Sequence, residues 1–445
     1  MAEFDSTSES SYSAIYDELF PICRSISGPG LRQSLEIFSR YMPIRIEGTR
    51  SGTQVYDWVV PQEWSIDSAV LTGPDGEVVC DFADSNLHVV NYSVPIDQEM
   101  SLEDLLPHLH GIPRLPSLVP YVTSYYRDNW GFCLPQDKID SLKPGQYHAK
   151  IVSNKYDGEV NFATHSLSGE CSREFLISSY LCHPSMANNE LSGPLVLLGL
   201  YDRISKWRKR RYTYRFALVP ETIGSICLLN KYGETFKQKL EAGLVLTCLG
   251  GPKPHLSYKT TRRTNTVLDQ LVSHIRRHGI NAYDIRPFTP VGGSDERQYC
   301  SPGFNLPVGQ MARTIYGEYD EYHTSGDNKE FMDTRALLKS VDDLEQLLTL
   351  HEYAGCFQNL APYGEPQLGK RGLYPSMNSP TKWRLSNDEM SDGRTMLERM
   401  LYILNYSDGE TPMLAIADMM NCSLTSLIPI IDKLEENSLL KMKDA

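Results

Sequence analysis

One stretch, residues 176–193, constrains the fold more than any other part of the chain, and it reads LISSYLCHPSMANNELSG. Its beginning, 176–181, is a short and mostly apolar run, which is typical of a strand buried on both faces of a sheet. His183 follows this run, and a histidine at the carboxyl end of such a strand faces the crevice where open α/β sheets bind ligands. Ser192 and Pro194 suit an N-cap and an early helical position. The stretch therefore predicts a strand, a polar loop that contains His183, and a helix.

Strand-like and helix-like segments alternate through the following region. Short apolar runs predict further buried strands at 212–219, 243–249 and 305–310. Apolar residues at helical spacing predict helices at 195–206, 264–278 and 333–354. This alternation is typical of an α/β sandwich with a mainly parallel sheet.

Two parts of the chain depart from the α/β pattern. Residues 44–121 contain short alternating segments separated by turn signals, so we expect an inserted β-rich domain there. From 386 to 445, three helical segments have the spacing of a winged helix. We therefore divide the chain into a main domain of residues 1–43 and 122–385, an inserted domain of residues 44–121 and a winged-helix-like module of residues 386–445.

The charge of the chain limits its partners. It has 43 Lys and Arg against 56 Asp and Glu, a net charge of −13, which disfavours general binding to nucleic acid or to anionic membranes. In the last helix of the winged-helix-like module, Asp432, Glu435 and Glu436 outnumber Lys433, so we expect this module to pack or dimerise instead of binding DNA. No apolar run reaches the ~20 residues needed to span a bilayer. We expect no nucleic-acid partner and no membrane partner.

Cysteine usage and the N-terminus indicate the compartment. The 10 cysteines are scattered without a CxxC pair, and the first ten residues are polar and acidic, unlike a signal peptide. We therefore expect a cytoplasmic protein with reduced thiols. Cys182, beside His183, has two interpretations: a soft metal ligand, or a core residue that alternates with Tyr180 along the strand. The core position is preferred.

Four motifs occur in the order in which di-zinc aminopeptidases with co-catalytic metals carry them. His183 ends a strand, and residues 189–193 (NELSG) resemble the family's Asp-Asn-Gly-Ser-Gly. Residues 216–221 (FALVPE) resemble a strand that ends in Glu-Glu, 293–295 (GSD) a Ser-Asp loop, and 322–324 (YHT) a Tyr-His-Thr motif. The chain resembles this zinc aminopeptidase-like family, and more closely a bacterial subgroup with an inserted β domain and a C-terminal winged helix. The resemblance implies an aminopeptidase-like three-layer α/β sandwich.

The same resemblance implies a metal site. It places ligands at His183, Glu221 and His323, and a set of two histidines and one glutamate is typical of zinc. Asn189 occupies the position of the family's bridging Asp, where a neutral amide binds zinc poorly. The family's other metal-binding Asp has no counterpart at 245–248. We therefore expect one zinc per chain, with Asn189 at a degenerate second position.

The family's general base also has no direct counterpart, because Pro220 stands where the first Glu of Glu-Glu is expected. The carboxylates that could replace it are Glu190, Asp295, Glu318 and Glu321. Asp295 is the best placed by resemblance to related zinc cyclases and peptidases. A base must reach the attacking water within about 3 Å, and the spacing of residues does not test this.

Further residues are candidates for contacts with the substrate. Tyr322 precedes His323 and has a hydroxyl that could stabilise an oxyanion, or a ring that packs. Arg297 and Glu318 are candidate substrate-binding residues. Arg297 has three interpretations: a partner of Asp295, a partner of a substrate carboxylate, or a solvated charge.

We expect a zinc-dependent amide-bond hydrolase of the aminopeptidase or deacylase type. An acyl or amide transferase in a biosynthetic pathway is the variant, because a lost base weakens water activation more than carbonyl polarisation. The alternative from another class is a catalytically silent scaffold or binding protein, in which Asn189 and Pro220 mark decay of the metal centre. The expected partner is a small-molecule or peptide-like amide substrate. Assembly into a homo-oligomer is a further possibility that the sequence leaves open.

Overall fold

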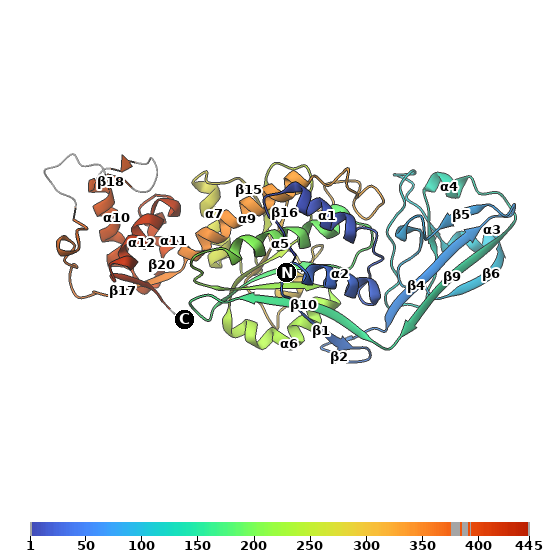
Figure 1. Ribbon diagram of the computed structural model, residues 1–445, viewed down its shortest axis with the longest axis horizontal. Coiled ribbons are helices and arrows are strands. Elements are labelled where there is room, and N and C mark those ends of the chain that lie inside the picture. Colours follow the sequence, from blue (N-terminus) through green and yellow to red (C-terminus); the bar gives the residue numbers. More distant parts are fainter. Residues whose placement is uncertain (1, 375–382, 385–389, 392, 444–445) are drawn as a thin grey trace.

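An eight-stranded mixed sheet lies at the centre of the molecule, between a β-rich unit at one end and a C-terminal unit at the other (Figure 1). The structure is a computed structural model that describes residues 2–374, 383–384, 390–391 and 393–443. In spatial order, the strands of the central sheet are β1 (Arg45–Arg50), β10 (Glu159–Leu167), β12 (Thr213–Val219), β11 (Glu174–Tyr180), β13 (Leu240–Leu246), β16 (Val308–Ala312), β14 (Leu256–Lys259) and β15 (Tyr283–Arg286).

The middle of this sheet is parallel and its edges are mixed. β12, β11, β13 and β16 run parallel to one another, whereas β10 and β1 add antiparallel strands on one side. On the other side β14 is antiparallel to β16, and β15 is parallel to β14. Every residue of β11 is buried, as its apolar sequence predicts for a strand covered on both faces. The predicted α/β sandwich with a mainly parallel sheet is confirmed, and the parallel part is its centre.

Helices cover both faces of the central sheet (Figure 1). One face is covered by α1 (Glu9–Leu19), α2 (Pro29–Ser39), α5 (Ser192–Ser205), α7 (Val267–Arg277) and α9 (Thr334–Ala354). The other face is covered by α6 (Ile223–Lys239) and α8 (Glu296–Tyr299). Burial of apolar side chains between these layers is the main driving force for this arrangement.

The start of α5 differs from its prediction. A π-helical turn, Ala187–Leu191, runs directly into α5. The Ser192 hydroxyl donates to the carbonyl of Asn188 and accepts from the N–H of Leu249 at 2.8 Å. The predicted N-cap role of Ser192 is therefore wrong, because its hydroxyl does not bond an N–H group of its own helix. It ties the turn after β11 to the chain that follows β13 instead.

The β-rich unit contains a four-stranded antiparallel sheet (Figure 1). In spatial order its strands are β5 (Val78–Asp81), β4 (Glu63–Thr72), β9 (Gln146–Tyr156) and β6 (Ile96–Ser101). Its short elements are α3 (Leu102–Leu105), α4 (Gln136–Asp140), β7 (Leu109–His110) and β8 (Phe132–Cys133). The predicted limits of 44–121 differ from this unit at both ends, because β1 belongs to the central sheet and β9 lies beyond residue 121. β9 continues almost directly into β10, so one long ribbon joins the two sheets.

A small hairpin projects from the central unit beside α6. It consists of β2 (Gln54–Val55) and β3 (Trp58–Val59), which pair antiparallel. The hydroxyl of Tyr56 donates to the carbonyl of Leu229 at 3.3 Å, and Val55 is completely buried. These contacts hold the hairpin against α6.

The C-terminal unit begins earlier than predicted. Its antiparallel sheet has the order β20 (Asp408–Pro412), β17 (Cys356–Asn359) and β21 (Leu440–Met442). Its helices are α10 (Gly393–Tyr406), α11 (Met413–Met419) and α12 (Ile428–Glu436), and it also has the short strands β18 (Trp383–Arg384) and β19 (Met390–Ser391). β17 precedes the predicted boundary at 386 and belongs to this unit because it pairs with β20 and β21. Residues 386–389, 392 and 444–445 of the predicted module lie outside the described residues.

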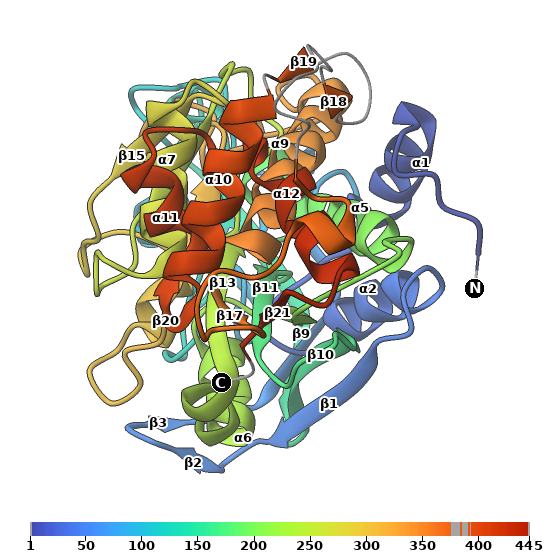
Figure 2. The same cartoon turned by 90° about the vertical axis from the view of Figure 1, so that its left-hand side faces the viewer.

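The acidic helix α12 carries charges that contact the main domain, and Figure 2 shows the C-terminal unit over the end of the central sheet. Arg211 donates to both carboxylate oxygens of Glu435, at 2.7 and 2.8 Å. The guanidinium group of Arg211 lies 4.7 Å from the ring centre of Tyr353, whose hydroxyl donates to Asp432 at 2.8 Å. The acidic side chains thus pair with groups of the main domain. This contact is a structural basis for the expected packing role, while the absence of a nucleic-acid partner stays a prediction.

Two further features concern the membrane and the thiols. Within the described residues, no single helix is long and apolar enough to cross a membrane, although the bent pair Met413–Met419 and Leu424–Glu436, with 98° between its helices, passes the length and composition test together. The 10 cysteines lie within the described residues and form no disulfide bonds with one another. Cys182 is buried in the apolar cluster beneath α6, which is the preferred core position.

Candidate active site

Three side chains of the predicted metal set converge at the carboxyl ends of the parallel strands. His183 follows β11 and Glu221 follows β12, and these strands are neighbours in the sheet. His183 Nε2 lies 3.9 Å from Glu221 Oε2. His323 comes from the long loop between β16 and α9, and its ring centre lies 5.2 Å from that of His183. The fold therefore brings together three residues that are far apart in the sequence.

A buried carboxylate orients the ring of His183. Glu190, in the π-helical turn, has no exposed side-chain surface, and its Oε2 lies 2.9 Å from His183 Nδ1. The fully buried Arg24 lies beside it, with Nε 3.7 Å from Glu190 Oε1 and 3.1 Å from the His183 carbonyl, to which it donates. A carboxylate that accepts the Nδ1 proton leaves the Nε2 lone pair free for a metal. Glu190 thus engages Nδ1, and Nε2 lies on the side of Glu221.

Burial and neighbouring charges set the protonation of these groups. Burial opposes the charged form of His183, but Cys182 and Glu190 raise the pKa of His183 well above its usual value. Burial raises the pKa of Glu221, although the charge of His183 acts against this. Burial, followed by the charge of His183, lowers the pKa of His323 to about 3. His323 is therefore neutral, which is the form of imidazole that binds metals.

The positions of the three side chains fit one tetrahedral ion. With metal–ligand distances of about 2.0–2.2 Å, two donor atoms on one zinc lie roughly 3.4 Å apart, and two bound imidazole rings have centres roughly 5 Å apart. The corresponding separations are 3.9 Å between the donor atoms of His183 and Glu221 and 5.2 Å between the histidine rings. The donor set and its spacing therefore suit zinc.

Asp295 lies behind Glu221 and supports the turn that carries it. Its Oδ1 accepts from the backbone N–H of Thr222 and from the hydroxyl of Ser225, both at 2.7 Å. Burial, and then the charge of Glu221, raise the pKa of Asp295 to about 8. Its Oδ2 is buried and has no hydrogen-bond partner within the described part of the chain. Thr222 has a φ of +64°, so the bond from Asp295 stabilises a strained turn directly after Glu221.

The neighbours of Asp295 in its loop also point to Glu221. The hydroxyl of Ser294 donates to Glu221 Oε1 at 2.7 Å, which leaves Oε2 on the side of His183. Arg297 Nε donates to the carbonyl of Ser294 at 3.2 Å, and its charge lowers the pKa of Glu221 against the larger effect of burial. This loop therefore positions Glu221 through one side-chain bond and one positive charge.

Asn189 lies in a buried hydrogen-bond network. Asn189 Oδ1 accepts from the hydroxyl of Tyr180 at 3.0 Å, and this hydroxyl also lies 2.6 Å from Thr247 Oγ1. The backbone N–H of Asn189 donates to Asp327 at 2.9 Å. Asn189 Nδ2 is buried, and no described residue bonds it. Asn189 thus presents a neutral amide at the position where the resemblance has a bridging carboxylate.

Tyr322 packs against His323, whereas Glu318 pairs with a lysine. The ring of Tyr322 stacks on that of His323, with centres 3.9 Å apart, and burial raises the pKa of Tyr322 well above its usual value. The ring of Tyr121 lies 5.1 Å from His183 and 5.3 Å from His323 and covers both. Glu318 is half exposed and pairs with Lys253 at 2.6 Å, so its charge is already engaged at the surface.

A cavity of about 200 Å³ opens onto His183 and Glu221. Its remaining lining residues are Ile26, Trp58, Tyr125, Tyr126, Cys182, Thr222 and Ile223. Tyr125 is fixed by a hydrogen bond of 2.6 Å between its hydroxyl and that of Tyr121. The cavity thus combines two polar groups at its base with aromatic walls, which is the usual composition of a small-molecule site.

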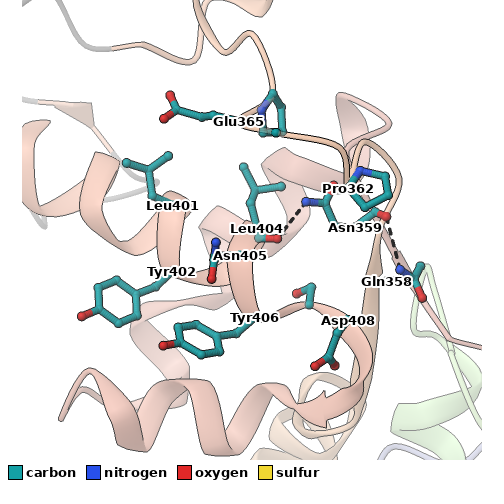
Figure 3. Close-up of a pocket in the computed structure, with 13 residues that line it drawn as sticks. Gln358, Asn359, Pro362, Glu365, Leu401, Tyr402, Leu404, Asn405, Tyr406 and Asp408 are labelled. Atoms are coloured by element: carbon teal, nitrogen blue, oxygen red, sulfur yellow. Dashed lines mark hydrogen bonds between the residues drawn. The ribbon is translucent and has the colours of Figure 1, made fainter.

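A cavity in the C-terminal unit and a histidine cluster are the other features that have the composition of a site. A cavity of about 770 Å³ in the C-terminal unit is lined by residues such as Tyr402, Tyr406 and Asp408 (Figure 3), and its described lining contains no histidine or cysteine. A cluster of His274, His278 and Asp418 has the residue types of a metal site. However, His274 Nδ1 lies 2.8 Å from Asp418, and its Nε2 accepts from the N–H of Leu424 at 3.0 Å. Both nitrogens of this histidine therefore hold the C-terminal unit against α7.

The sequence did not reveal several functional contacts. Glu190 is a candidate base by sequence, but its contact with His183 depends on a π-helical turn that the sequence pattern does not predict. Arg24 lies near the N-terminus, and only the tertiary structure places it under His183. The adjacent Tyr125 and Tyr126 suit either the wall of a substrate cleft or ordinary packing, and both line the cavity, whereas Tyr121 carried no separate signal.

Comparison with protein families identifies the chain. A family model described as a domain of unknown function (DUF4910) matches residues 12–354. The chain belongs to this family. A second family model, described as a winged helix-turn-helix, matches residues 355–442. It confirms the predicted C-terminal winged helix and agrees with β17 as the first strand of that unit.

Individual relatives of this DUF4910 protein agree with the assignment. A Clostridium acetobutylicum protein whose name describes a polysaccharide biosynthesis protein with an aminopeptidase-like domain is 40% identical over 430 residues, which cover 96% of this chain and 95% of that protein. A crystal structure from the same organism, described as that of a peptidase, has 38% identity and a TM-score of 0.85, and it covers 98% of this chain and 97% of its own. A zinc aminopeptidase from Bacillus subtilis has a TM-score of 0.56 at 11% identity, over 79% of this chain and 96% of that one. The predicted aminopeptidase-like fold is confirmed.

Proposed function

We propose that this protein is a zinc-dependent amide-bond hydrolase with one zinc per chain, held by His183, Glu221 and His323. The observation that carries the proposal is the convergence of the three side chains at spacings that suit one tetrahedral ion. The ion would polarise the amide carbonyl and lower the pKa of a water molecule. Its donor set leaves one tetrahedral position open, as catalytic zinc sites do.

The residues of the chain have distinct roles in this proposal. Glu190 keeps the proton on His183 Nδ1, and Ser294 holds Glu221 in place. Asp295 is the candidate base carried over from the resemblance, and its Oδ1 also holds the turn after Glu221 through the N–H of Thr222. Tyr322, whose ring stacks on that of His323, is the proposed donor to the oxyanion, and Arg297 adds positive charge near Glu221. Glu318 is the weakest candidate for substrate binding because Lys253 engages it.

The reaction consumes one water. The water oxygen forms a bond with the amide carbon, the C–N bond breaks, and the proton lost by the water passes to the departing nitrogen. The products are a carboxylic acid and an amine. Because the name of the 40% identical relative refers to polysaccharide biosynthesis, we propose the N-acyl group of an amino sugar as the amide. Transfer of that acyl group to another amine is the variant.

Release of amine from N-acetylglucosamine oligomers tests this function. We expect chelation to abolish the release, added zinc to restore it, and His323→Ala to lose it. His278→Ala is the matched control, because this partly exposed histidine belongs to the structural cluster on α7, and it should retain activity. If the zinc-loaded protein cleaves neither these oligomers nor simple amino-acid amides, the silent scaffold takes the place of the enzyme.

A further inference from the structure

A second cavity adjoins the candidate active site, and the two share one lining residue. It has a volume of about 400 Å³ and shares Trp58 with the cavity that contains His183 and Glu221. Its walls are the β2–β3 hairpin, α6 and the segment 298–304. The lining residues are Tyr56, Asp57, Trp58, Ile226, Leu229, Glu234, Lys237, Gln298, Ser301, Gly303 and Phe304. We call this cavity the aromatic groove. A substrate that reaches past Trp58 from the zinc position would enter it.

The groove exposes aromatic side chains that ordinary folding would bury. Tyr56 is 54% exposed, Trp58 is 37% exposed, and Tyr126, at the border of the first cavity, is 53% exposed. Trp58 contacts Tyr126 edge to face with ring centres 5.5 Å apart, and Tyr56 contacts Phe304 at 5.6 Å. A group of exposed aromatic residues beside a catalytic cavity marks a binding surface.

The hairpin presents these rings in a fixed position. Val55 is fully buried and pairs with Trp58, and the Tyr56 hydroxyl is bonded to Leu229 of α6. Gln54 Nε2 donates to the Tyr56 carbonyl at 2.6 Å and closes the turn. Tyr56 has a φ of +54°, a strained conformation that these contacts maintain. A rigid aromatic surface binds a ligand with little loss of conformational entropy.

The charged side chains that line the groove are one basic residue, Lys237, and two acidic residues, Glu234 and Asp57. Lys237 Nζ lies 2.9 Å from Glu234 Oε1 and 5.2 Å from the ring centre of Phe304. Asp57 leaves the lining with a net negative charge, which disfavours a phosphate or a carboxylate as the ligand. Gln298 and Ser301 supply donors and acceptors for uncharged hydroxyl and amide groups. This chemistry suits a neutral ligand with an apolar face and polar edges.

We propose that the aromatic groove binds a neutral sugar unit next to the N-acylated unit whose amide lies at the zinc position. A pyranose ring has a flat face of C–H groups for Trp58 and hydroxyls at its edge for Gln298 and Ser301. The substrate class is thus an oligosaccharide of at least two units, instead of a free amino sugar. The position of the substrate amide at the zinc site rests on the proposed function. The binding of a sugar unit in the aromatic groove does not depend on it.

Calorimetric titration of the zinc-loaded, full-length protein tests the groove. The ligands are the trimer of N-acetylglucosamine, its monomer and leucyl-phenylalanine amide. We expect the trimer to bind about tenfold more tightly than the monomer and Trp58→Ala to remove that advantage, as loss of a central aromatic contact does. Trp58→Phe should restore part of it. Tyr402→Ala is the matched control, because Tyr402 is also 37% exposed and lines the remote cavity of Figure 3.

The same titration with His323→Ala separates the two proposals. This variant should lose zinc and keep the Trp58-dependent affinity for the trimer, because His323 does not line the groove. Trp58-dependent binding without cleavage of any amide would support the groove and contradict the proposed function. The sugar site is overturned if the trimer binds no tighter than the monomer, if Trp58→Ala leaves its affinity unchanged, or if only the dipeptide amide shows the dependence.

Discussion

Replacement of Glu190 by Gln tests how the protein holds its metal. The carboxylate has no exposed surface, lies 2.9 Å from His183 Nδ1 and is the charged partner of the buried Arg24. Removal of its charge leaves Arg24 buried without compensation, which costs about 3–5 kcal/mol of the free energy of unfolding. Loss of a carboxylate that orients a metal-binding histidine lowers metal affinity about 10–100-fold. The two effects have different causes, so they can be separated.

The double variant Arg24→Met with Glu190→Gln makes this separation. It should recover part of the lost stability in urea unfolding of the zinc-free protein, because no unpaired buried charge is left, and it should not recover zinc affinity measured with a competing chelator. Glu318→Gln is the control: its partner Lys253 is 40% exposed, so the loss should stay below about 1 kcal/mol. Zinc affinity of Glu190→Gln within a factor of two of the wild type would refute the role of Glu190.

Three further predictions concern packing and protonation. Arg211→Ala breaks the paired hydrogen bonds to Glu435 and should destabilise the contact of the C-terminal unit by about 3 kcal/mol; unchanged thermal unfolding and proteolysis would contradict this. Gly193→Ala should cost about 1–3 kcal/mol in urea unfolding, because its Cβ would lie 2.4 Å from the Ser179 hydroxyl and 2.6 Å from the Leu246 carbonyl, whereas Gly303→Ala has open space and should not. The raised pKa of Asp295, about 8 against 3.8, means that its contribution to stability is full below pH 3.8 and is lost as the pH rises to 8. Asp295→Asn should therefore weaken the pH dependence of the free energy of unfolding of the zinc-free protein between pH 3.8 and 8. An unchanged dependence would contradict this prediction.

Local sequence patterns predicted the elements that surround the site. The apolar run before His183 and the helix after it follow from burial on both faces of a sheet. The limits of the β-rich unit did not follow, because β9 and β10 are one ribbon that pairs in two different sheets. Pairing partners are far apart in the chain, so the local alternation that marks a strand does not say which sheet it joins.

The candidate site was predictable to the extent that it repeats a family motif. His183, Glu221 and His323 came from resemblance, and the structure places them beside one another. Glu190 and Arg24 were not assigned to their contacts with His183, because a buried charge pair leaves no periodic signal. Trp58 was also missed as a site residue, because a short hairpin with exposed aromatic residues looks like any edge of a β-rich region.

Zinc per chain is the most direct measurement of the central claim. Elemental analysis of protein purified without chelators or an affinity metal should give one zinc per chain for the wild type and for His278→Ala, and much less for His183→Ala and His323→Ala. Two zinc ions per chain would contradict the single site that Asn189 implies. No zinc in the wild type even after its addition, or unchanged zinc in the His323→Ala variant, would contradict the proposed metal centre itself.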